Sequence, residues 1–408
     1  MIIMQSLRRN IRIWWQPPRN ISDREEERSV TFLELFYDLV YVILIAELAH
    51  TLSDHVNLAG VLGFAFIFVI VWIAWVNGTM YHELHGNNDI RTRVFTFLQM
   101  FTVAAMAVFA HGALGESSVG FALSFAAYQL ILTYLWWRTG VYDPHHRPLS
   151  RSYTVNMSIS TLIFVGSVFV PMPWRFYLWG LALFLSVLLP MVINQMQART
   201  RPEVQAQIEI AYTASPSAVE RFGLLTIIVL GEVMVSVVRG VSAHEHLSWM
   251  VGITAVLGIL IAIGLWWLYF DAISQHLPIN TQSKTIGWMY LHLPMTIGIV
   301  ATGAAVFNVV EAAGEPLAPE IRWLLVGAIS LALISNAVLM RSIQIPETYF
   351  ELYRRSGIAT FISGGIVLLL GFSSLNTIPL LLIVIILMLA PVIYGIAVWV
   401  HIRGVTQL

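Results

Sequence analysis

Three carboxylates interrupt an apolar run of membrane-spanning length near the start of the chain. The run, VTFLELFYDLVYVILIAELAHTL, covers residues 30–52 and contains Glu34, Asp38 and Glu47. An ionised carboxylate inside hydrocarbon costs roughly 3 kcal/mol, so each acid needs a partner, water or a proton. On a helix, Glu34 and Asp38 lie one turn apart, about 6 Å, whereas Glu47 points almost the opposite way. The pattern predicts a helix inside a bundle, with acids that can bind a cation or relay protons.

Later apolar segments carry similar groups, and together they suggest a hydrated pathway. We expect the pathway to be lined by Glu34, Asp38, Glu220 and Glu232, with Glu47, Asp271 and His292 as secondary members. The competing interpretation is that Arg221 and Arg239 pair with nearby acids in structural ion pairs. Six acids against two arginines leave several acids without a cation, which favours a functional role for the set.

The composition is that of an integral membrane protein. Of 408 residues, 58% are hydrophobic and 11% are charged, against roughly 25% charged residues in soluble domains. The net charge of −1 gives no reason to expect nucleic-acid binding. Cysteine is absent, which excludes disulfides, thiolate metal sites and cysteine nucleophiles.

Apolar segments recur twelve times, each near the twenty residues that cross about 30 Å of hydrocarbon. They cover residues 30–52, 58–80, 92–114, 119–137, 153–171, 174–195, 219–241, 247–270, 286–310, 321–341, 357–376 and 378–402. The sequence therefore predicts an all-α polytopic protein with about twelve transmembrane helices in a lipid bilayer.

The loop charges predict the orientation of these segments. With twelve spans, Arg175, Arg239 and Arg322 lie on one side, and the other 19 of the 22 basic residues lie on the opposite side. Because basic residues accumulate in the cytoplasm, we expect both termini there, in a bacterial inner membrane. The domains expected are a tail (1–29), a first six-helix repeat (30–196), a linker (197–218) and a second repeat (219–403).

Internal similarity suggests that the two halves are duplicated. FTFLQMFTVAAMAV and WMYLHLPMTIGIVA align so that Gln99 falls opposite His292. Glu34 likewise matches Glu220 at the start of each half. An even number of spans per repeat predicts two parallel repeats, related by an axis along the membrane normal.

The tail and two loops allow further interpretations. RIWWQPP, with Trp14 and Trp15, fits an interfacial helix or a disordered basic tail. The loops YHELHGNND and YDPHHRP supply the candidate metal ligands His82, His85, Asp89, Asp143, His145 and His146. Their spacing is poor for a metal site, so we expect solvated loops and neither a metal nor a cofactor. The alternative is a membrane-embedded, metal-dependent lipid-modifying enzyme.

Four motifs in order identify a family resemblance. They are FLELFYDLVYVILIAELAHTL, ERFGLLTIIVLGE, WWLYFD and YLHLPMTIGIVA, within residues 32–401. The sequence resembles the bacterial low temperature requirement protein A family, which implies a polytopic bacterial membrane protein associated with growth in the cold. The family supplies no reaction, so no catalytic residue is carried over. We expect a small-solute transporter or channel linked to protons or cations, with a non-transporting scaffold or sensor as a further alternative. The solute and the oligomeric state stay open.

Overall fold

The computed structural model describes residues 16–20 and 28–406, with side chains as far as residue 400. All named elements within these residues are helices, so the predicted all-α class is confirmed. Each predicted apolar segment corresponds to one helix. The first six are α2 (Phe32–Asp54), α3 (Leu58–His85), α4 (Ile90–Ala110), α5 (Ser118–Tyr142), α6 (Arg147–Ser167) and α7 (Trp174–Thr200). The last six are α9 (Pro216–Ser242), α10 (Trp249–Phe270), α11 (Gln282–Glu311), α12 (Pro319–Leu339), α13 (Glu347–Leu369) and α14 (Thr377–Thr406).

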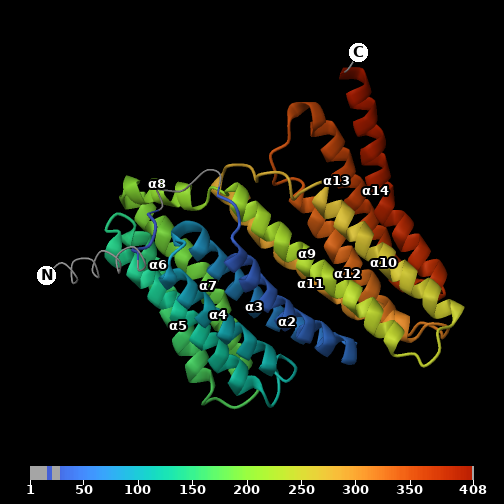
Figure 1. Cartoon of the computed structure of the whole chain (residues 1–408), viewed down its shortest axis with the longest axis horizontal. Coiled ribbons are helices and arrows are strands. Elements are labelled where there is room, and N and C mark those ends of the chain that lie inside the picture. The colour runs from blue at the N-terminus through green and yellow to red at the C-terminus, as the bar shows by residue number, and fades with distance from the viewer. Residues whose placement is uncertain (1–15, 21–27, 407–408) are drawn as a thin grey trace, which may run out of the picture. The chain divides into compact units, whose positions relative to one another are not determined.

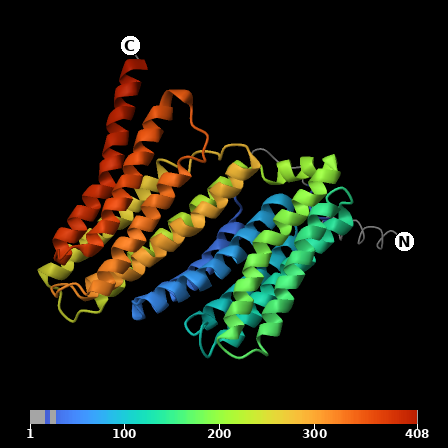
Figure 2. The same cartoon turned by 180° about the vertical axis from the view of Figure 1, so that it is seen from behind.

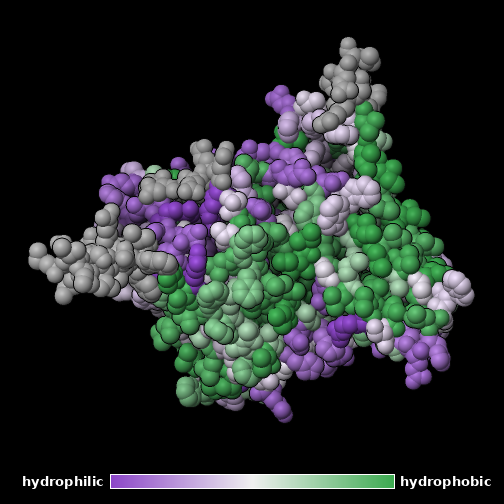
Figure 3. Space-filling view, viewed as in Figure 1, coloured by the Kyte–Doolittle hydropathy of each residue, from purple (hydrophilic) through white to green (hydrophobic). Residues whose placement is uncertain are grey.

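Ten of these helices are long and apolar enough to cross a membrane. The two outside that set are α2, which carries the three carboxylates, and α6, which is rich in serine. Apolar side chains cover the lengths of the helices, while hydrophilic side chains gather near the helix ends (Figure 3). This distribution is the one that a hydrocarbon environment selects. The chain is therefore a multi-pass membrane protein.

The chain divides into two compact units. Unit 1 contains residues 1–47 and 69–218, and unit 2 contains residues 48–68 and 219–408. In unit 1, α4, α5, α6 and α7 pack one against the next, and the short helix α8 (Pro202–Ala211) packs on α6 and α7 (Figures 1 and 2). Helix α8 lies within the predicted linker, which is therefore partly helical. The outer face of α7 is apolar, with Tyr177, Leu181 and Phe184 exposed.

Helix α11 is the most buried of the candidate spans and packs along α12 in unit 2. The two backbones approach closely at Gly298, where an added Cβ would lie 2.7 Å from the Ala328 carbonyl oxygen and the Ala332 nitrogen. Small residues allow such close approaches between membrane helices. Gly298 is therefore a close helix-packing contact in unit 2.

Two of the three basic residues that the sequence sets apart from the other 19 donate to backbone carbonyl groups. Arg175 donates to the Ser167 carbonyl oxygen at 3.1 Å and the Val168 carbonyl oxygen at 3.1 Å, at the end of α6. Arg322 donates to the carbonyl oxygens of Ser373 and Leu375, just after the 3₁₀ turn that follows α13. Free carbonyls at a helix C-terminus carry partial negative charge and attract cations. The Arg175 and Arg322 side chains thus bind backbone carbonyls close to where α6 and α13 end.

We expect Gly298→Ala to destabilise unit 2 by about 1–3 kcal/mol, because its new methyl group would force apart two backbones that cannot yield. The measurement is equilibrium unfolding of the purified protein in mixed micelles. Gly287→Ala, on the same helix with open space around it, is the matched control and should leave stability unchanged or raised. Equal effects of the two changes would contradict the packing argument.

Candidate functional site

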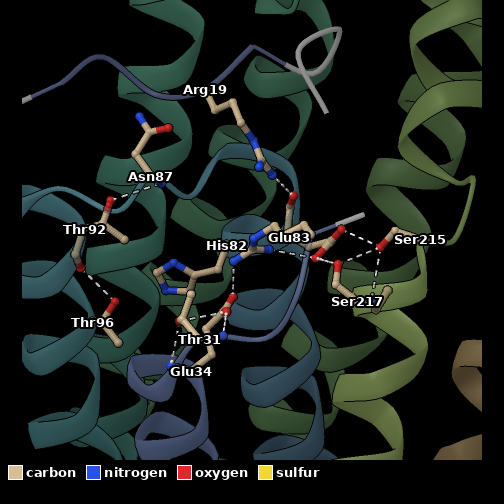
Figure 4. Close-up of polar contacts among 12 residues, drawn as sticks. Arg19, Thr31, Glu34, His82, Glu83, Asn87, Thr92, Thr96, Ser215 and Ser217 are labelled. Atoms are coloured by element: carbon tan, nitrogen blue, oxygen red, sulfur yellow. Dashed lines mark hydrogen bonds and ion pairs between the residues drawn. The ribbon is translucent and has the colours of Figure 1, made fainter. Parts of the chain in front are cut away.

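Arg28 joins two buried carboxylates in unit 1. Its Nη2 lies 2.5 Å from Glu34 Oε1, and its Nη1 lies 2.9 Å from Glu83 Oε2 (Figure 4). Arg28 precedes α2, Glu34 lies in the first turn of α2, and Glu83 lies near the end of α3. One guanidinium therefore joins two acids from different helices.

Hydroxyl groups and a backbone N–H also donate to these acids. Ser215 Oγ donates to Glu83 Oε1 at 2.5 Å, and Ser217 Oγ donates to Oε2 at 2.8 Å. Thr31 donates to Glu34 Oε2 from its backbone nitrogen at 2.9 Å and its hydroxyl at 3.0 Å. Charge-assisted bonds of this kind can hold a carboxylate ionised although it is buried. We call Arg28, Thr31, Glu34, Glu83, Ser215 and Ser217 the Arg28 cluster.

A cavity of about 790 Å³ lies beside the cluster. Its wall includes Arg28, Glu34 and His82, together with the polar turn after α3. The His82 Nε2 lies 3.0 Å from Gln99 Oε1, which links α3 to α4 behind the wall. We call this space the polar cavity. Its size is that of a small-molecule site, and its wall presents guanidinium, carboxylate, imidazole and amide groups.

The segment at residues 16–20 packs against the end of α3. Gln16 donates its backbone N–H to Asp89 Oδ2 at 2.9 Å, and the Arg19 N–H donates to the His85 carbonyl oxygen at 3.2 Å. The disordered-tail interpretation is therefore wrong for these residues, whereas the interfacial helix expected around Trp14 and Trp15 lies outside the described residues. Burial raises the pKa of Asp89, but hydrogen bonds from Thr92 and Gln16 together lower the pKa by more, so the net shift is downward.

The first histidine segment is buried, which corrects the expectation of a solvated loop there, whereas the second is mostly exposed apart from His146. Helix α3 continues to His85, so His82 and His85 lie on a packed helix, and His146 meets His85 with ring centroids 4.7 Å apart. Burial lowers the pKa of His146 from 6.5 to about 4. His145 is exposed. Among the side chains of residues 16–20 and 28–400, no three histidine or acidic groups gather as metal ligands.

Unit 1 contains three of the predicted pathway residues, in different surroundings. Glu34 belongs to the Arg28 cluster. Asp38 is fully buried and accepts a hydrogen bond from Trp75 Nε1 at 2.8 Å. Glu47 is half-buried in the middle of α2.

Unit 2 contains the other four. Glu232 is buried on α9, while Glu220 at the start of α9 is exposed. His292 is buried, with Nδ1 2.7 Å from the Trp288 carbonyl oxygen and Nε2 3.1 Å from the Tyr269 hydroxyl. Because a carbonyl only accepts, Nδ1 carries the proton and a neutral ring accepts from Tyr269. Asp271 follows α10 and lines a second cavity, of about 460 Å³.

Arg239 contacts an imidazole, whereas the sequence suggests a pair with a nearby acid. Arg239 Nη2 lies 2.8 Å from His50 Nδ1, and its guanidinium stacks over the Phe307 ring at 5.1 Å. The described contact is thus with an imidazole. Asp54, one turn after His50, lies 3.8 Å from the same Nδ1.

Sequence analysis missed Glu83 and the serines that bind it. Glu83 was placed in a solvated loop, because the apolar run in α3 weakens before the helix ends. The signal for Ser215 is readable, however: serine before proline is typical of a helix N-cap, and Ser215 Oγ does accept from the Ala218 N–H at 3.0 Å. Its second partner, Glu83, is 132 positions away and has no local signal.

We expect Glu83→Gln to destabilise unit 1 by about 2–3 kcal/mol, because it removes a charge that receives one guanidinium and two hydroxyl bonds. The free energy of unfolding in detergent measures the loss. Glu351→Gln is the control: Glu351 pairs with Arg354 and Arg355, but all three are exposed, so little should change. A similar effect of both variants would argue against a buried, charge-dependent cluster.

Acid should weaken unit 1 through His146. Its folded pKa of about 4 lies below the ordinary 6.5, so the unfolded state binds the proton more tightly and stability falls as the pH drops below 6.5. The total loss is about 3 kcal/mol by pH 4. His146→Phe should flatten the dependence of the melting temperature on pH between 7.5 and 5, whereas His145→Phe, at the exposed neighbour, should leave it unchanged. An unaltered slope in His146→Phe would refute the assignment.

Comparison with known proteins places these features in a family. The model of the bacterial low temperature requirement A protein family matches residues 29–400. An uncharacterized protein of Rhizobium meliloti (strain 1021) is 24% identical over 295 residues, which cover 69% of this chain and 69% of that protein. No solved structure matches. The family match spans both units and all the residues of the Arg28 cluster except Arg28 itself, and the chain belongs to the bacterial low temperature requirement A family.

Proposed function

We propose that the chain moves a small solute across the bacterial inner membrane, and that this movement is linked to, or consists of, protons or cations. The observation that carries the proposal is the Arg28 cluster at the wall of the polar cavity. Two buried carboxylates there share the Arg28 guanidinium. Intramembrane or membrane-edge acids of this kind are found along ion and proton pathways.

The cluster gives a physical route from proton or cation uptake to a change in the cavity wall. A proton on Glu34 would remove the charge that holds Arg28 Nη2, while the contact of Arg28 Nη1 with Glu83 would remain. Glu83 also accepts from two serine hydroxyls, which hold it in place. Protonation of Glu34 would therefore loosen one side of the Arg28 guanidinium at the cavity wall.

The proposed roles of the other pathway residues rest on their side-chain chemistry and burial. Asp38 in unit 1 and Glu232 in unit 2 are buried acids and would carry the charge deeper into each unit. Glu47, Glu220 and Asp271 would supply acids at other depths. His292 has a partner on each ring nitrogen, so its contribution would be to hold Tyr269 and Trp288 rather than to carry protons.

The proposal includes twelve spans in two parallel repeats, with both termini in the cytoplasm. A similar polar contact inside each unit supports it: Gln99 on α4 meets His82 on α3, and His292 on α11 meets Tyr269 on α10. These are the third and second helices of each proposed repeat. Gln99 and His292 are the pair that the repeat alignment makes equivalent.

The test is solute and proton flux in proteoliposomes of the purified chain. We expect flux that responds to pH and falls at least about tenfold in Glu232→Gln and in Glu34→Gln, because each change removes an ionisable group from the path. Glu351→Gln, an exposed acid, is the control and should transport normally. Unchanged flux in both Glu232→Gln and Asp38→Asn would defeat the assignment, and absence of any flux would favour a scaffold or sensor.

A further inference from the structure

Unit 2 contains a second cavity, of about 460 Å³, whose chemistry differs from that of the polar cavity. It lies among the end of α10, the first half of α13 and the part of α14 that follows Pro391. Aromatic side chains line it from all three directions: Trp267 from α10, Tyr353 from α13 and Trp399 from α14. We call it the aromatic cavity.

The aromatic cavity carries a negative charge. Asp271 lines it, and the Trp267 Nε1–H donates to Asp271 Oδ2 at 2.5 Å. Among its lining residues, all within the described part of unit 2, there is neither lysine nor arginine. His276 also lines the cavity, and its Nε2 lies 3.3 Å from the Tyr353 hydroxyl. A carboxylate among aromatic rings is the arrangement that binds organic ammonium ions.

A buried hydroxyl group in the wall also lacks a partner. Ser356 is 9% exposed and lines the cavity, and its Oγ makes no hydrogen bond among the described residues. Thr360, one turn later, instead donates its hydroxyl to the Ser356 carbonyl oxygen at 2.9 Å. Buried hydroxyls in helices normally bond in this way, so the Ser356 hydroxyl is an exception within the described part of unit 2.

An aromatic belt at the membrane interface explains part of this composition, because tryptophan and tyrosine favour that depth. Trp266, which is exposed beside Trp267, fits that explanation. A belt does not require a half-open hollow between three helices, a carboxylate held by an indole or an unpartnered buried hydroxyl. These three features together indicate a ligand site.

We propose that the aromatic cavity binds an organic ammonium compound that carries an apolar group. The ammonium lies near Asp271 and the faces of Trp267, Tyr353 or Trp399, and the apolar part lies along Val392 and Ile396 on α14. The Ser356 hydroxyl bonds a polar group of the ligand. The same chemistry occurs in an aminophospholipid headgroup and in a free alkylammonium solute.

The test uses choline as the probe and the full chain in phosphatidylglycerol nanodiscs. We expect saturable choline binding by isothermal titration calorimetry, above that of empty nanodiscs. The uncharged isostere 3,3-dimethyl-1-butanol, which has the same shape without the charge, should bind at least about tenfold more weakly. This comparison needs no variant, so a folding defect cannot imitate it. Equal binding of the two probes would overturn the proposal.

Variants then locate the site. Asp271→Asn should weaken choline binding at least about tenfold, and Ser356→Ala should weaken it less, while Glu351→Gln, on α13 outside the cavity, should bind as the unaltered chain does. Full affinity in a folded Asp271→Asn protein would refute the site. Phosphatidylethanolamine in the nanodiscs distinguishes the two sources: competition with choline identifies a lipid headgroup, and its absence identifies a free solute. The assay measures binding alone, so its outcome is independent of transport.

Discussion

Polar side chains buried among apolar helices need partners inside the protein, because hydrocarbon offers none. This constraint decides where the ionisable groups of each unit lie. In unit 1 it joins Glu83 to a guanidinium and two serine hydroxyls. In unit 2 it gives both nitrogens of His292 a partner. Arg175 and Arg322 likewise have partners inside the protein, because they bind carbonyls close to where helices end. The polar groups are thus part of the helix packing and not additions to it.

The Arg28 cluster shows how such partners connect distant parts of the sequence. Its members come from the segment before α2, from the first turn of α2, from α3 and from the residues around the start of α9. Because one guanidinium joins two acids, the protonation state of either acid affects the contacts of the other members.

The two cavities differ in the charge that they present. Arginines and acids line the polar cavity of unit 1, with hydroxyl and amide groups around them. The aromatic cavity of unit 2 presents one acid among rings and aliphatic side chains. A polar wall suits a hydrated solute, and an aromatic wall suits a desolvated organic cation. The two units therefore present cavities of different chemistry, because the polar and aromatic residues near the helix ends differ between them.

Apolar runs near twenty residues long were enough to predict every long helix and the membrane, because burial of a helix in hydrocarbon depends on local composition. Glu34, Asp38, Glu232 and His292 were predicted as candidates for the same reason, since an ionisable residue in such a run is locally anomalous. The distant members of the Arg28 cluster had no such signal. Glu83 and Ser217 look like ordinary polar residues near helix ends, and Ser215 is readable only as a helix N-cap; tertiary packing alone brings them together with Arg28. Hydrogen bonds between residues more than a hundred positions apart depend on how helices assemble, and no window of sequence contains that information.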